Sequence, residues 1–162
     1  MGVTAALAGC SSIRRRDVRF SATSRFSAYA YSSPVTTIDL FEAGPPFYAT
    51  VLPSESALER ELDADAFSEG HEHWFDEADF DEEFVTLFAS RRFLVEPGRN
   101  SGDLVTTRFT EPEAVFRVTV DSWPKSTVLD DPPRVFVETR RHSRNGDDPP
   151  RSVSVRYSMP TQ

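Results

Sequence analysis

The chain has 162 residues, 38% of them hydrophobic and 27% charged, with a formal net charge of −8. This length and composition exclude a disordered chain and allow one domain with a core that needs no disulfide or metal. No apolar run approaches the ~18 residues of a membrane-spanning helix. The acidic balance also argues against a nucleic-acid partner, which would require a basic groove.

The basic residues are almost all arginine, since Lys125 is the only lysine among 18 Lys and Arg. An acidic, lysine-poor surface favours a protein of salt-loving archaea, because concentrated salt screens repulsion between carboxylates. A GC-rich genome, which favours arginine codons, is the alternative. Charge is also segregated: residues 39–83 hold 15 acidic residues and one basic residue, Arg60. This segment is either a solvated, salt-adapted surface or a surface that steers a ligand.

The first twelve residues contain the single cysteine, Cys10, directly after Leu-Ala-Gly. These four residues resemble a lipobox, so residues 1–12 are interpreted as the remnant of a signal peptide whose start lies upstream. Cys10 would then be lipidated and would anchor the chain to the outer face of the cell membrane. The alternative is a small buried thiol. A single cysteine allows no intramolecular disulfide.

Residues 13–25 are predicted to form either a tether or a first strand, and residues 26–160 a single β-rich domain. Strands are predicted at 26–31, 35–41 and Phe47–Leu52, because each is short, β-favouring and bounded by breaks rich in Ser, Gly or Pro. An amphipathic helix is predicted at 54–67, with Ser54 as its cap.

Glu69, His71 and His73 form the one cluster that has the composition of metal ligands. In a strand, residues two apart point to the same face, so these three side chains could bind a divalent metal such as zinc. A polar turn leading to Trp74 is the competing interpretation.

The run 84–89 is predicted to be a central strand, because its apolar residues would cover both faces of a sheet. Alternation of apolar and polar residues predicts further strands, joined as an antiparallel meander, at 92–96, 104–110, 116–120, 135–140 and 153–157. The predicted fold class is therefore mainly β: an antiparallel sandwich or half-open barrel with one packed amphipathic helix.

The order of strand, helix, Asp-Phe-Asp-Glu-Glu-Phe-Val at 79–85 and meander is similar to small secreted haloarchaeal lipoproteins of unknown function. More distantly it resembles the C-terminal domain of the B-type subunits of protease complexes. The resemblance covers residues 47–157, but 97–103 lacks the Thr-Gly-Gly-Tyr-like loop of the latter family. It implies a β-rich binding or accessory domain and assigns no site residue.

The sequence lacks the nucleophile, phosphate-binding and zinc-protease motifs of known enzymes. The function expected is a non-catalytic, membrane-anchored, extracytoplasmic binding or accessory module that needs no cofactor and has a possible protein partner at the cell surface. Two alternatives remain open. One is a metal-dependent hydrolase that uses His71 and His73, and the other is a structural subunit of the cell envelope whose sheet edges pair with a partner.

Overall fold

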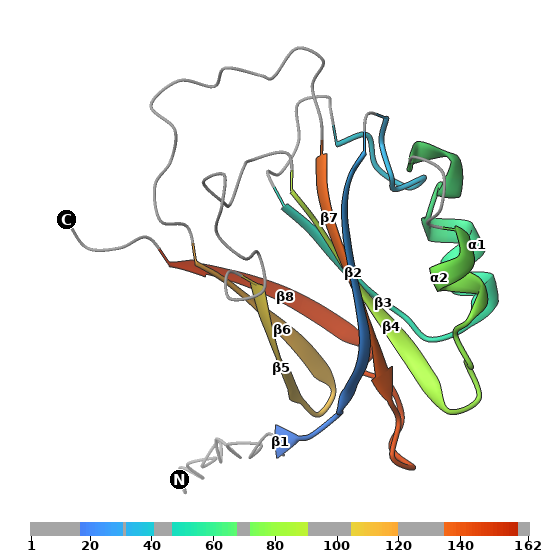
Figure 1. The fold of residues 1–162 in the computed structure, drawn as a ribbon. Coiled ribbons are helices and arrows are strands. Elements are labelled where there is room, and N and C mark those ends of the chain that lie inside the picture. Colours follow the sequence, from blue (N-terminus) through green and yellow to red (C-terminus); the bar gives the residue numbers. More distant parts are fainter. Residues whose placement is uncertain are drawn as a thin grey trace, which may run out of the picture.

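The computed structural model describes residues 17–30, 32–40, 47–67, 72–90, 105–119 and 135–158. They form two stacked sheets with a layer of short helices on one side (Figure 1). The elements in chain order are β1 (Asp17–Val18), β2 (Ala22–Ala30), β3 (Phe47–Leu52), α1 (Glu55–Glu61), η1 (Ala64–Ala66), α2 (Glu72–Asp76), β4 (Glu83–Ser90), β5 (Val105–Thr110), β6 (Glu113–Thr119), β7 (Val135–Ser143) and β8 (Ser152–Ser158).

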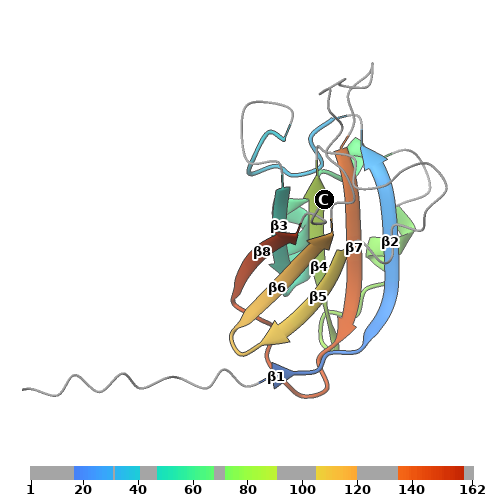
Figure 2. The ribbon, with the colours of Figure 1, turned by 90° about the vertical axis from the view of Figure 1, so that its left-hand side faces the viewer.

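Sheet A has the strand order β1-β5-β6-β8, and sheet B has the order β2-β7-β4-β3. The sheets pack face to face, and the edge strands β3 and β8 approach each other on one side. Figure 2 shows sheet A in front of sheet B, and the helix layer of α1, η1 and α2 covers the far face of sheet B. The prediction of a mainly β sandwich is therefore confirmed.

The predicted central strand is confirmed as β4, which lies between β7 and β3 and is buried along nearly its whole length. Val85, Leu87 and Ala89 pack into a core beneath the helix layer. Phe84 and Phe88 point the other way, into the core between the sheets. Successive side chains of β4 point to opposite faces of sheet B, and both faces are covered. This explains why the run does not alternate between apolar and polar residues.

The helix predicted at 54–67 is shorter than expected. Ser54 caps it as predicted, accepting a hydrogen bond from the Ala57 amide, but α1 ends at Glu61. Leu62 is extended, and its one bridge with Val35 is the only ladder contact formed by the described part of the predicted strand 35–41. The chain then makes the 3-10 turn η1. Burial of Leu62 and Val35 in one core favours this bridge over further helix.

A second helix, α2, lies where a strand or turn was predicted. It is held against sheet B by Trp74, whose Nε1 donates a hydrogen bond to Ser24 Oγ at 2.9 Å. The guanidinium of Arg141 lies 5.2 Å from the Trp74 ring centroid, and Phe75 contacts the Phe26 ring. Aromatic packing therefore holds this five-residue helix, which is too short to be stable alone.

The predicted antiparallel meander is wrong. β6 pairs in parallel with β8, and β7 between them in sequence crosses into sheet B to pair with β2 and β4. Residues 135–139 are buried on both faces, so β7 requires a central position that the end of a meander does not offer. Tyr157 of β8 is 59% exposed at the edge of sheet A, where its ring contacts Phe47.

Segment 13–25 was predicted to be either a tether or a first strand. Its described part, 17–25, contains β1 and the start of β2, and residues 13–16 lie outside the described residues. The predicted strand at 92–96 also lies outside them. No helix in the described part of the chain is both long and apolar enough to cross a membrane.

Candidate functional site

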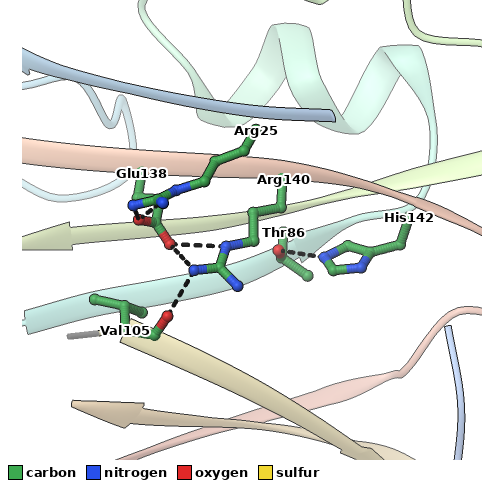
Figure 3. A network of polar contacts seen from close by, with 6 residues as sticks. All are labelled: Arg25, Thr86, Val105, Glu138, Arg140 and His142. Carbon is green, nitrogen blue, oxygen red and sulfur yellow. Dashed lines mark hydrogen bonds and ion pairs between the residues drawn. The ribbon is translucent and has the colours of Figure 1, made fainter. Parts of the chain in front are cut away.

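A charged cluster lies inside the sandwich, on the face of β7 that points to sheet A. Glu138 is 2% exposed and sits in the same row as Phe136, Arg140 and His142. Arg25 of β2 donates hydrogen bonds to Glu138 Oε2 from Nε at 3.0 Å and from Nη2 at 2.5 Å. Arg140 approaches Oε1 with Nε at 2.9 Å and Nη2 at 2.7 Å (Figure 3). Two guanidinium groups therefore hold one carboxylate.

The cluster also links the two sheets. Arg140 Nη2 donates a hydrogen bond to the Val105 carbonyl oxygen of β5 at 2.6 Å (Figure 3). Removing a carboxylate from water costs several kcal/mol, which two charged partners with good geometry offset. Because both Glu138 oxygens already accept hydrogen bonds from arginine, this carboxylate is poorly placed to act as a base or metal ligand.

His142 lies next to this cluster, almost completely buried. Its Nε2 is 3.0 Å from Thr86 Oγ1, and its ring stacks on Phe84 and meets the edge of Phe109. Burial, and secondarily the charge of Arg140, lowers the pKa of His142 to about 4. The ring is therefore neutral at pH 7. At 3% exposure the side chain is shielded from solvent.

Glu138, Arg25 and Arg140 were not identified as a cluster from the sequence. One signal was present: residues 135–139 read Val-Phe-Val-Glu-Thr, so a glutamate interrupts a run that is apolar on both faces. A carboxylate in such a strand must be buried with a cationic partner. The identity of the partner depended on the pairing of β2 with β7, which places Arg25 beside Arg140.

Of the three predicted metal ligands, the structure describes only His73, which is exposed and lies on the helix α2 rather than on a strand. Glu69 and His71 lie outside the described residues, as does Cys10. Within the described ranges, no group of three or more His, Cys, Asp or Glu side chains is arranged to hold a metal ion.

The helix layer contains a surface groove of about 310 Å³ between α1 and the turn that leads from α2 into β4. We call it the acidic groove. Its lining residues are Glu55, Leu58, Glu59, Phe75, Asp76, Ala78, Asp79, Phe80 and Asp81. Five of these are exposed carboxylates, the other four are apolar, and none is basic.

Local hydrogen bonds fix the shape of the acidic groove. Asp79 accepts hydrogen bonds from the Asp81 amide through its side chain and from the Glu83 amide through its carbonyl. Leu58 and Phe75 are anchored in the core, so the floor is apolar and rigidly supported. A concave site with an apolar floor and carboxylates at its rim is suited to a cationic group that carries an aliphatic or aromatic stem.

Two further pockets, of about 510 and 520 Å³, flank the loop from β7 to β8 and share Asp148, Pro149, Pro150 and Arg151. Arg151 and Asp148 form an exposed ion pair at 3.5 Å. Neither pocket contains histidine, cysteine or another buried titratable side chain. Comparison with protein families, with curated proteins and with solved structures finds no match to this chain.

Proposed function

We propose that this protein is a non-catalytic binding module, anchored through lipidated Cys10 to the outer face of the cell membrane, and that its acidic groove binds a cationic segment of a protein partner. The observation that carries the binding proposal is the lining of the groove: five exposed carboxylates around an apolar floor, without a basic residue. An arginine or lysine side chain presents both an apolar stem and a positive charge, which fits that lining.

The charged groups of the interior support a binding role over a catalytic one. A general base or nucleophile must reach its substrate, yet Glu138 and His142 are 2% and 3% exposed. Glu138 is occupied by Arg25 and Arg140, and His142 bonds to Thr86. Both groups are thus engaged with partners inside the sandwich, which leaves the surface groove as the better candidate site.

Binding at the groove is tested by titrating the protein with a short arginine-rich peptide at about 0.1 M salt, where surface charges interact over roughly 10 Å. The variant Glu59→Gln/Asp76→Asn removes two carboxylates of the groove and is expected to raise the Kd about tenfold or more. Asp147→Asn/Asp148→Asn is the matched control, because both residues are exposed and outside the groove. Equal affinity for the two variants would contradict the proposal.

Anchoring is tested separately in cells that process lipoproteins. The full precursor is expected to partition into detergent, and Cys10→Ser is expected to move it to the aqueous fraction. Unchanged partitioning of the variant would refute lipidation at Cys10 without affecting the groove.

A further inference from the structure

The outer face of sheet A carries arginine where the helix layer carries carboxylates. Arg117 of β6 and Arg156 of β8 are direct partners in the parallel register, and Arg108 of β5 lies on the same face. All three are exposed, because their sequence neighbours Phe116, Val118 and Val155 point into the core between the sheets. We call these three residues the arginine face. Figure 2 shows the sheet from this side.

Two charges of the arginine face are not neutralised within the described part of the chain. Arg108 forms an ion pair with Asp17 at 2.6 Å. Among the residues that the structure describes, neither Arg117 nor Arg156 has an ion-pair or hydrogen-bond partner. Like charges at directly opposed sheet positions repel each other. An external anion that touched both guanidinium groups would relieve this repulsion.

The shape of this face favours an extended anionic surface over a small ligand. The side chains project from neighbouring strands of a sheet, and a guanidinium binds a phosphate with two parallel hydrogen bonds. Such contacts form at short range, where dissolved salt weakens the attraction between opposite charges less than it does at a distance.

The position of β1 relative to Cys10 indicates which anionic surface the arginine face could contact. β1 is an edge strand of sheet A and begins at Asp17, seven residues after Cys10. Seven residues span at most about 25 Å when fully extended. A lipid on Cys10 would thus hold the β1 edge of sheet A within about 25 Å of the bilayer. The helix layer lies across the sandwich, beyond sheet B (Figure 1), and it carries the acidic groove.

We propose that the arginine face docks on the anionic phosphate headgroups of the membrane and so directs the acidic groove away from the bilayer. The inference rests on the proposed anchoring at Cys10, but the contact itself needs no lipid on the protein. Two arginines near an anionic surface give only weak binding, which is enough to orient a domain that is already anchored.

The experiment uses the full chain with Cys10→Ser, so that only the electrostatic contact is measured, and follows co-sedimentation with vesicles at about 0.1 M salt. Vesicles of phosphatidylglycerol and phosphatidylcholine are compared with vesicles of phosphatidylcholine alone. Binding is expected only to the anionic vesicles. Arg117→Glu/Arg156→Glu is expected to lower the partition coefficient at least about tenfold, because it reverses two charges at the contact.

Arg156→Glu and Arg60→Glu form a matched pair of single variants, since Arg60 is an exposed arginine on α1, across the sandwich. Arg156→Glu should weaken binding and Arg60→Glu should not. Equal effects of the two, or equal binding to neutral vesicles, would overturn the proposal. If the protein sediments without vesicles in a concentration-dependent way, and Arg156→Glu abolishes that sedimentation, the arginine face would instead be an interface with a second copy of the chain. If the full precursor fails to partition into detergent, only lipidation at Cys10 is refuted. If the protein fails to bind the arginine-rich peptide, only the role of the acidic groove is refuted.

Discussion

At the scale of single residues, the interior of the sandwich contains more charge than an apolar core requires. Glu138 is balanced by Arg25 and Arg140, and the cluster ties β2, β7 and β5 together. A buried ion pair of this kind often adds little net stability compared with an apolar replacement, but removing one partner leaves an uncompensated charge. We therefore expect Glu138 to act mainly by favouring this pairing of strands and sheets over others.

Glu138→Gln is expected to lower the free energy of unfolding by about 2 to 3 kcal/mol, because the largely buried Arg140 would lose its carboxylate partner, whereas Arg25 is 35% exposed and stays hydrated. Urea unfolding followed by circular dichroism measures the loss. Glu77→Gln is the control: its ion pair with Arg141 is 3.6 Å long, its side chain is 59% exposed, and its loss should cost no more than about 1 kcal/mol. Similar values for the two variants would show that the cluster is not energetically distinct.

His142 predicts how stability changes with pH. Burial, followed by the charge of Arg140, lowers its pKa to about 4 in the folded protein, whereas the unfolded chain has an ordinary value of 6.5. The unfolded state therefore binds the proton more readily. The stability that His142 contributes is fully present above about pH 6.5 and declines as the pH falls toward 4, by at most about 3 kcal/mol.

The measurement compares urea unfolding of wild-type protein and His142→Gln between pH 4 and pH 7, a range that spans the two pKa values. His142→Gln is expected to be less stable at pH 7 but to lose less stability on acidification. Parallel pH profiles of the two proteins would mean that His142 does not supply the proton linkage.

At the scale of elements, the sequence predicted best where apolar residues followed a simple period. β3 matched its predicted bounds, β4 was predicted as a central strand, and the start of α1 was given by its Ser54 cap. Each of these depends on local chemistry or on burial of both strand faces. The end of α1 depends instead on Val35, 27 residues earlier than its bridge partner Leu62, and no local pattern contains that information.

The same reasoning explains why the strand order and the interior cluster were missed. An alternating pattern tells which face of a strand is buried but not which strand lies beside it, so β6, β7 and β8 were predicted as a meander. Once β7 is placed between β2 and β4, Arg25 and Glu138 meet across neighbouring strands. The acidic groove was likewise foreseen only as an acidic segment, because its apolar floor depends on how α1 packs beside α2.

The placement of β4 gives the sharpest test of the architecture. Leu87 is fully buried, so Leu87→Asp would put an unpaired carboxylate into the core at a cost of several kcal/mol, comparable to the 5 to 15 kcal/mol that typically stabilises a domain. The variant is expected not to fold, as seen by circular dichroism. Thr106→Asp, on the exposed face of β5, should fold normally. A folded Leu87→Asp protein would be incompatible with β4 as the centre of sheet B.

At the scale of the whole molecule, charge is divided between the two outer surfaces of the sandwich. Carboxylates gather on the helix layer, and arginine projects from the outer face of sheet A. The interior pairs its own charges and contributes little to this asymmetry. Such a division orients the domain in an electric field or near a charged surface, which a uniformly acidic shell of the same net charge would not do.

The crowding of acidic residues on the helix layer predicts that salt stabilises the protein. Glu55 and Glu59 are one helical turn apart on α1, and both face Asp76, Asp79 and Asp81 across the acidic groove. Like charges at this helical spacing cost a few tenths of a kcal/mol per pair in dilute salt. Raising the ionic strength from about 0.1 M to 1 M shortens the screening length from about 10 Å to 3 Å and removes most of that repulsion.

The Tm is therefore expected to rise steeply between about 0.1 M and multimolar KCl, as measured by thermal unfolding. In Glu55→Gln/Glu59→Gln the rise should be smaller, because part of the repulsion is already absent. A Tm that stays flat or falls with KCl would show that the acidic surface is not adapted to salt, and it would leave the binding of a cationic partner as the better explanation for the same carboxylates.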